Sequence, residues 1–172
     1  MRMTMSRRSA VRANIAVLAA VAILASMIPL PAVAGDAVLT LRSATAIGQQ
    51  EVRLTEGDLL SLPQVTVRTG TEFTDGVVEF VGPLARDVLA LVAAGTATTA
   101  HMVAANQYAV DIPISDFANY DVIFALFADG KRLSLRDKGP IWVMYPLDQH
   151  EELQDSLYNV RLIWQLTAVE LQ

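Results

Sequence analysis

Short apolar runs separated by turn residues make up most of the chain after residue 35. Residues 38–44 and 64–69 alternate apolar and polar side chains, the pattern of a strand with one buried face. The strands that such runs predict lie at residues 38–44, 51–54, 64–69, 77–81, 101–105, 109–112, 122–128, 141–145 and 161–171. Many strands without regular strand–helix alternation indicate an α+β, strand-rich mixed fold. No repeat or Pro/Ser-rich linker divides residues 35–172, so we expect a single domain there.

Helices are predicted where capping residues precede apolar residues at helical spacing. Thr55 and Asp58 form a variant of the capping box, and Pro63 ends the helix that they start. Gly82-Pro83 predicts the start of a second helix, which Gly95 ends. The apolar face expected for it consists of Leu84, Val88, Leu91 and Val92. Shorter helical segments are expected at a turn capped by Ser115-Asp116 and at residues 151–157.

Residues 124–146 combine two apolar runs with a turn and a charged loop. Asp129-Gly130 tolerates positive φ, so two strands are expected to meet there. The loop that follows holds Arg132, Arg136, Asp137 and Lys138. Loops on a rigid strand support often carry function, so this one is a candidate ligand contact. A surface ion-pair cluster is the plainer alternative.

Residues 1–34 have the pattern of a cleavable export signal. Four arginines precede an apolar run at residues 15–30, and Ala32-Val33-Ala34 matches the small-x-small cleavage pattern. Pro29 and Pro31 interrupt the run, which argues against a retained transmembrane anchor. Ser6-Arg7-Arg8 also suggests the twin-arginine type of leader. We therefore expect a periplasmic or secreted protein that does not insert into the membrane after cleavage.

Charge and cysteine content narrow the function classes. Removing 34 of the 172 residues would leave 138, and loss of the four leader arginines takes the formal net charge from −5 to −9. Such an acidic chain repels nucleic acid and anionic lipid, so neither is an expected partner. The sequence contains no cysteine, which excludes disulfides and thiolate chemistry. His101 and His150 lack the convergent donors that a metal site needs, so no metal ligand is assigned. No catalytic residue is assigned either.

Several segments, in order, resemble the sulfite-oxidase-like molybdopterin-binding oxidoreductase domain family. The matching segments are residues 52–63 (VRLTEGDLLSLP), 82–89 (GPLARDVL), 106–113 (NQYAVDIP), 129–146, which holds Asp129, Gly130, Leu133, Gly139, Pro140 and Pro146, and 163–170 (IWQLTAVE) with Trp164. The resemblance covers essentially all of residues 35–172 and implies that family's fold. It also implies molybdopterin as a cofactor.

The chain departs from this family where the cofactor is held. Catalytic members ligate molybdenum through a cysteine at the end of the third strand, and that position falls at Thr69 or Gly70 here. A threonine hydroxyl is a poor substitute for an anionic thiolate. The N-terminal segment that grips the pterin in catalytic members has no counterpart, and Trp142 stands where a basic residue is common. Absence of the cofactor is therefore favoured over its presence.

The candidate ligand pocket combines residues from three parts of the chain. It consists of Thr69, Gly70, Asp75, Asn106, Tyr108, Arg136 and Lys138. Glu72, Asp75 and Glu79 flank the turn beside the lost cysteine position, and a solvated turn is the alternative for them. Tyr108 matches a pocket-wall tyrosine of the family, although a tyrosine there is equally explained by packing.

Three functions remain open from the sequence. The leading hypothesis is a non-catalytic derivative that binds a small anionic or pterin-like ligand, or an exported or membrane-anchored protein partner. A protein can keep its fold after the residues that carry catalysis are lost. The alternative is a molybdopterin-dependent oxidoreductase that acts on an oxyanion or sulfoxide with atypical metal ligation. The twin-arginine pattern favours this alternative, since cofactor-loaded proteins are exported folded. The third is a purely structural subunit, so whether the protein is an enzyme stays open.

Overall fold

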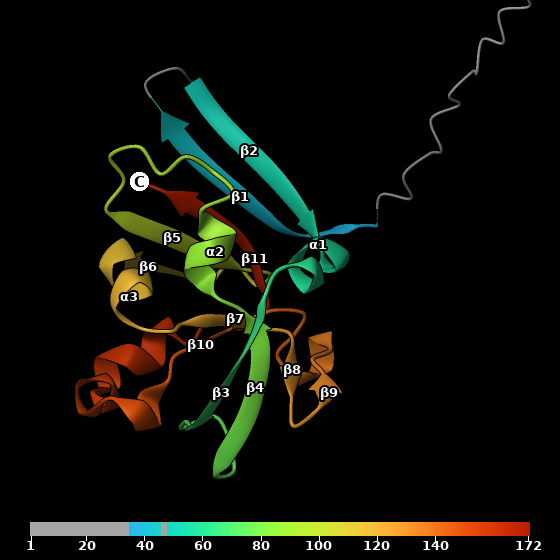
Figure 1. The fold of residues 1–172 in the computed structure, drawn as a ribbon, viewed down its shortest axis with the longest axis vertical. Helices are drawn as coiled ribbons and strands as arrows, with labels where there is room; N and C mark the ends of the chain where they lie inside the picture. Colours follow the sequence, from blue (N-terminus) through green and yellow to red (C-terminus); the bar gives the residue numbers. More distant parts are fainter. Residues whose placement is uncertain (1–34, 46–47) are drawn as a thin grey trace, which may run out of the picture. The chain divides into compact units, whose positions relative to one another are not determined.

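The computed structural model describes residues 35–45 and 48–172, and the leader predicted at residues 1–34 lies outside the described residues. The largest sheet has the strand order β2-β1-β11-β5-β6 (Figure 1). Its strands are β1 (Ala37–Thr45), β2 (Gly48–Thr55), β5 (Thr99–Ala104), β6 (Ala109–Pro113) and β11 (Leu166–Leu171). β1 and β11 run parallel, and the other neighbours are antiparallel. The first and last strands of this domain therefore pair at the middle of one sheet.

A second, antiparallel sheet has the order β3-β4-β8-β9. Its strands are β3 (Gln64–Gly70), β4 (Val77–Pro83), β8 (Phe127–Ala128) and β9 (Lys131–Arg132). Asp129 and Gly130 join β8 to β9 with φ values of 47° and 71°, so the predicted turn is confirmed. Both residues take the left-handed conformation that a two-residue hairpin turn requires.

A short strand pair, β7 (Ile123–Ala125) with β10 (Trp142–Met144), lies between the two larger sheets (Figure 1). Isolated bridges join Leu84 to Ile123 and Trp142 to Trp164. At Gly82 in β4, an added Cβ would lie 2.0 Å from the carbonyl oxygen of Phe124. Only glycine permits this close approach of β4 to β7.

The helices are short. They are α1 (Glu56–Ser61), α2 (Ala85–Leu89) and α3 (Ile114–Asn119), with 3-10 helices η1 (Leu135–Asp137), η2 (Leu147–Gln149), η3 (Glu151–Gln154) and η4 (Ser156–Arg161). The capping box is confirmed: Thr55 Oγ1 accepts from the Asp58 N–H at 3.2 Å, and Asp58 Oδ2 accepts from the Thr55 N–H at 2.8 Å. None of the described helices is long and apolar enough to cross a membrane.

The core lies between the sheets and under these helices. Its largest fully buried side chains include Phe80, Met102, Phe117, Phe124 and Tyr145, one or more from each layer. Almost every core residue is apolar, as expected for a domain without disulfides that must derive its stability from burial. The strand-rich α+β class predicted from the sequence agrees with this architecture.

Four local predictions were wrong in detail. The second helix spans only α2, and Leu91 is 42% exposed because the chain has already left the helix there. Ser115 and Asp116 do not cap α3: Pro113 holds the N-cap position, and Asp116 lies inside the helix with its carboxylate turned to buried partners. The helix expected at residues 151–157 is a pair of 3-10 helices. The last strand begins at Leu166, because η4 and a single bridge at Trp164 occupy the residues before it.

Candidate ligand-binding site

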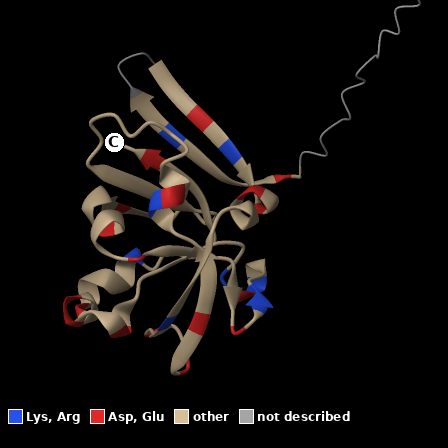
Figure 2. Cartoon of the chain, in the orientation of Figure 1, with Lys and Arg blue, Asp and Glu red and all other residues tan. Residues whose placement is uncertain are grey.

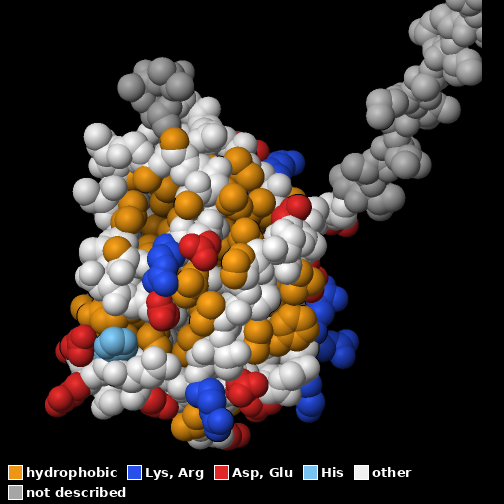
Figure 3. All heavy atoms as spheres, viewed as in Figure 1, with side chains coloured by type: hydrophobic (Ala, Val, Ile, Leu, Met, Phe, Trp, Pro, Cys, Tyr) orange, Lys and Arg blue, Asp and Glu red, His pale blue; other side chains and the backbone are white. Residues whose placement is uncertain are grey.

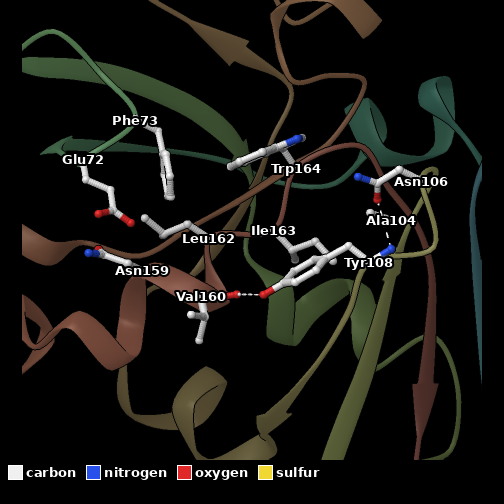
Figure 4. A pocket seen from close by; sticks show the side chains of 10 residues that line it. All are labelled: Glu72, Phe73, Ala104, Asn106, Tyr108, Asn159, Val160, Leu162, Ile163 and Trp164. Atoms are coloured by element: carbon white, nitrogen blue, oxygen red, sulfur yellow. Dashed lines mark hydrogen bonds between the residues drawn. The ribbon is translucent and has the colours of Figure 1, made fainter.

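A cavity of about 310 Å³ opens beside the turn that follows β3 (Figure 4). We call it the aromatic cavity. Its walls come from that turn (Glu72 and Phe73), from the β5–β6 hairpin (Ala104, Asn106 and Tyr108) and from Asn159, Val160, Leu162, Ile163 and Trp164. Most of its lining is apolar, and such a cavity is large enough for a small ligand, since ligand pockets usually measure ~300–1,000 Å³.

The β3–β4 turn presents Phe73 to the cavity. The Phe73 N–H donates to Thr71 Oγ1 at 3.1 Å, and the Thr71 N–H donates to Thr74 Oγ1 at 3.0 Å, so the threonines fold the turn locally. Lys138 Nζ donates to the Phe73 carbonyl at 3.0 Å and lies 4.8 Å from the centre of the Trp142 ring. The turn is therefore fixed both by its own hydroxyls and by a lysine from a distant loop.

The aromatic rings at this wall pack edge to face. The Phe73 and Trp164 rings lie 5.1 Å apart at 75°, and Trp164 in turn packs on Trp142 at 6.3 Å. Such T-shaped pairs add about 0.5–1.5 kcal/mol beyond the burial of their area. Trp142 Nε1 donates to the Leu162 carbonyl at 3.0 Å. This bond ties the cavity wall at residues 159–164 to the buried strand β10.

The hairpin wall is built around Tyr108. Its hydroxyl donates to the Val160 carbonyl at 3.1 Å, which joins the hairpin to η4 across the cavity (Figure 4). Asn106 Oδ1 accepts from the Tyr108 N–H at 3.0 Å, and Gln107 between them has φ of 68°. Tyr108 is 45% exposed, so one part of the ring lines the cavity while the rest faces solvent.

A buried ion pair holds η4 in place. Arg161 Nη1 donates to Asp116 Oδ2 at 2.5 Å, and the two side chains are only 12% and 10% exposed. The Tyr145 hydroxyl donates to the same oxygen at 2.8 Å. Burial, and then the negative charge of Asp116, raises the pKa of the Tyr145 phenol above its ordinary value. The pair lies behind the cavity wall and is not part of its lining.

The seat where the family resemblance expects a metal-binding thiolate is closed by an aspartate. Thr69 is fully buried, and its hydroxyl accepts from the Asp148 N–H and donates to the Gly70 carbonyl, both at 3.3 Å. Asp148 Oδ2 accepts from the Gly70 N–H at 2.8 Å. Every polar group at this position thus has a partner within the chain. A buried metal ligand would instead be left aimed into open space.

These residues do not fit molybdopterin. No thiolate is available because the sequence contains no cysteine, and the Asp148 carboxylate is hydrogen-bonded to the Gly70 N–H at this position. Lys and Arg are absent from the lining of the adjoining polar pocket, which runs from Gly70 to Asn159 within the described residues. A phosphate-bearing, anionic group placed there would therefore meet carboxylates instead of counter-charges.

The structure brings only part of the predicted pocket together. Asn106 and Tyr108 line the aromatic cavity, and Lys138 supports its wall from outside. Thr69 and Gly70 belong instead to the closed seat, where Gly70 lines the polar pocket. Asp75 and Arg136 are exposed and line neither pocket. Whether any of the seven binds a ligand stays a prediction.

Sequence reasoning did not assign residues 159–164, although they supply a whole wall of the cavity. Residues 161–164 were expected inside a continuous strand and residues 159–160 in the connection before it, and 3-10 helices carry no strong periodic signal that would show otherwise. Glu72 was noticed only as one of several turn carboxylates. Its position between the aromatic cavity and the polar pocket appears only in the folded chain.

Comparison with known proteins supports the fold and no more. No family model and no curated protein matches the chain. Among solved structures, the domain shows a distant similarity in fold to a sulfite-oxidase-like protein. One match is to the crystal structure of the sulfane dehydrogenase SoxCD from Paracoccus pantotrophus, with a TM-score of 0.59 and 17% sequence identity. It covers 77% of this chain and 37% of that chain. The resemblance stated from the sequence is thereby supported at the level of the fold.

Proposed function

We propose that this chain is an exported, non-catalytic relative of sulfite-oxidase-like oxidoreductases that binds a small molecule in the aromatic cavity. One observation carries the proposal: at the position where the resemblance expects a metal-binding thiolate, Thr69 and Gly70 are hydrogen-bonded to Asp148, while the cavity beside it is lined by aromatic side chains. Binding has replaced redox chemistry on the same scaffold, because function belongs to sites and not to folds.

The non-catalytic part follows from the chemistry of the seat. A metal in this fold needs a soft anionic donor, and Thr69 offers a neutral hydroxyl that already has two hydrogen bonds. The carboxylate on the Gly70 N–H fills the position with a group from the chain itself. The residues that remain can hold the strand ends together, but they have no acceptor for electrons.

The binding part follows from the cavity. Phe73, Tyr108 and Trp164 give it apolar, polarizable walls, and Glu72 and Asn159 give it a polar end (Figure 4). A small ligand can bury apolar area against the rings and hydrogen-bond at that end. The anion expected from the sequence is less suited, because Arg136 does not line the cavity and Lys138 is engaged by Phe73 and Trp142. A flat pterin-like heterocycle with N–H donors remains compatible with Glu72.

Trp164 offers a direct test of binding. Trp142 and Trp164 are the only tryptophans in the sequence, and because Trp164 lines the cavity while Trp142 is buried, a ligand in the cavity of the unaltered protein should change the fluorescence of Trp164. A neutral fluorescent reporter of naphthylamine type is expected to bind and to quench Trp164. Tyr108→Leu should weaken this binding, whereas Tyr108→Phe, which keeps the ring, should retain most of it. If the reporter does not bind saturably to the protein with Tyr108 unchanged, the proposed binding function is wrong.

Metal analysis tests the loss of catalysis separately. Protein purified from a molybdopterin-competent host is expected to contain essentially no molybdenum and to release no pterin fluorophore on denaturation. Stoichiometric molybdenum would favour the oxidoreductase alternative instead. Export is tested by cell fractionation and by sequencing the N-terminus of the purified protein, which should begin at Gly35 if the predicted cleavage occurs.

A protein partner is a second candidate, favoured by the exposed apolar side chains at and near the cavity rim. Leu157 is 54% exposed and Val160 50% exposed, both on η4 beside Tyr108. Charge is distributed unevenly around them: the segment from η2 to η4 is acidic, whereas basic residues gather on β9 (Figure 2). A crosslinking experiment on the exported protein, with Leu157→Ser as the weakened variant, tests this candidate.

A further inference from the structure

We infer that the ligand of the aromatic cavity is a small organic cation, an ammonium ion with compact alkyl substituents. This inference rests on the proposed binding function and adds the charge and chemical class of the ligand. It is carried by the arrangement of one carboxylate and three aromatic rings around a cavity that no basic side chain lines.

The charges at the cavity favour a cation. Glu72 is the charged side chain in the lining, and no Lys or Arg lines the cavity in the part of the chain that the structure describes. Figure 4 shows the Glu72 carboxylate beside Asn159 at one end of the cavity. Asp148 carries a further negative charge in the adjoining polar pocket, which also contains Glu72. An anion entering here would be repelled from both pockets.

Two cations next to the cavity walls, Arg161 and Lys138, already have other partners, and Arg68 on β3 does not line the cavity. Arg161 follows the cavity residue Val160 directly, but its guanidinium is 2.5 Å from Asp116 and lies over the Tyr158 ring at 4.8 Å. Lys138 donates to the Phe73 carbonyl and lies over the Trp142 ring. Neither neutralises Glu72. The carboxylate therefore remains available to a cation supplied by the ligand.

The rings supply the second half of the recognition. The face of an aromatic ring carries partial negative charge, so a positive group within ~6 Å of ring centres is attracted, and tryptophan is the strongest of the three types. Phe73 and Trp164 are nearly perpendicular, and Tyr108 comes from a different wall. Rings that meet at such angles suit a roughly spherical alkylammonium group better than a flat, stacked heterocycle.

Choline and its uncharged carbon isostere, 3,3-dimethyl-1-butanol, separate charge from shape. Both have the same size and hydroxyl, and only choline carries the positive charge. Titrations of the unaltered protein, read by calorimetry and by tryptophan fluorescence, should give choline an affinity about tenfold higher or more, as expected for a desolvated cation–π contact. Sulfate and a simple pterin serve as the anionic and the flat neutral probes, and both should bind more weakly than choline.

Glu72→Gln tests the carboxylate with little change in shape. It should lower the affinity for choline several-fold at low salt and leave the isostere unaffected, because a partly exposed ion pair contributes modestly and is screened by salt. Glu79→Gln is the matched control: it removes the same charge from an exposed side chain on β4 that does not line the cavity, and choline should still bind as to the parent.

The outcomes separate this inference from the function beneath it. Three results would contradict a cationic ligand but not the binding function. They are equal affinity for choline and the isostere, preferential binding of the pterin or sulfate, and binding of the neutral reporter without binding of choline. Failure of the neutral reporter and of all four probes would overturn both.

Discussion

Asp116 shows how much of this structure depends on one side chain. Its Oδ2 atom accepts hydrogen bonds from Arg161 and from the Tyr145 hydroxyl, which come from 45 and 29 residues further along the chain. The three groups lie between α3, β10 and η4. Because η4 supplies part of the cavity wall, the ion pair positions cavity-lining residues without lining the cavity itself.

Replacing one member of this pair is expected to cost more than replacing both. Asp116→Asn leaves the Arg161 charge buried without a counter-charge, and such a change typically costs ~3 kcal/mol of unfolding free energy. The double variant Asp116→Asn, Arg161→Met removes that buried charge and should recover a substantial part of the loss. Urea unfolding of the four proteins of the cycle measures this. Additive losses would show that the two side chains are not energetically coupled.

The Tyr145 phenol is expected to make the free energy of unfolding decrease as the pH rises into the alkaline range. Its pKa is raised in the folded protein, so the folded state keeps its proton at a pH where the unfolded chain releases it. The contribution of Tyr145 is fully present below about pH 10, the ordinary pKa of tyrosine, and declines as the pH rises above it. Tyr145→Phe should therefore show a shallower loss of unfolding free energy from pH 9 to pH 11. Identical slopes in urea unfolding would contradict this origin.

At the scale of elements, the β3–β4 turn depends on a contact from outside itself. Lys138→Met keeps the alkyl stem over Trp142 but removes the donor to the Phe73 carbonyl. We expect about 1 kcal/mol lower stability, the usual net value of such a hydrogen bond, and weaker binding in the cavity. Amide exchange should become faster in residues 70–76. Lys131→Met on the exposed strand β9 is the control, and equal exchange in both variants would refute the role of Lys138.

Elements with a local cause were predictable from the sequence. The capping box of Thr55 and Asp58 and the turn at Asp129-Gly130 depend on residues within three positions of one another, and both formed as expected. Asp116 was misplaced as a helix cap because its true partners are distant in sequence. The aromatic cavity could not be predicted from the sequence for the same reason. Phe73, Tyr108 and Val160 meet only because the β3–β4 turn, the β5–β6 hairpin and η4, which are far apart in the sequence, come together in the folded chain.

At the scale of the whole molecule, the separation of charge also arises only on folding. Figure 3 shows a group of acidic side chains at the lower left of the visible face and a group of Lys and Arg side chains along its right side. The acidic end corresponds to η2 through η4, which border the polar pocket through Asp148 and Gln154. A positively charged ligand is thus attracted toward the pockets before contact, and the attraction should weaken as salt is raised.

The resemblance stated from the sequence expects a metal-binding thiolate at Thr69 or Gly70, so Thr69→Cys tests whether one thiol is enough for metal binding. Thr69→Cys restores the thiol that the resemblance expects, yet the Asp148 carboxylate would still hold the Gly70 N–H. A buried thiol beside a carboxylate resists ionisation, since burial and negative charge both raise its pKa. We therefore expect the variant, purified from a molybdopterin-competent host, to contain essentially no molybdenum. Stoichiometric metal in Thr69→Cys would show that the lost sulfur alone separates this chain from catalysis, and that Asp148 does not close the seat.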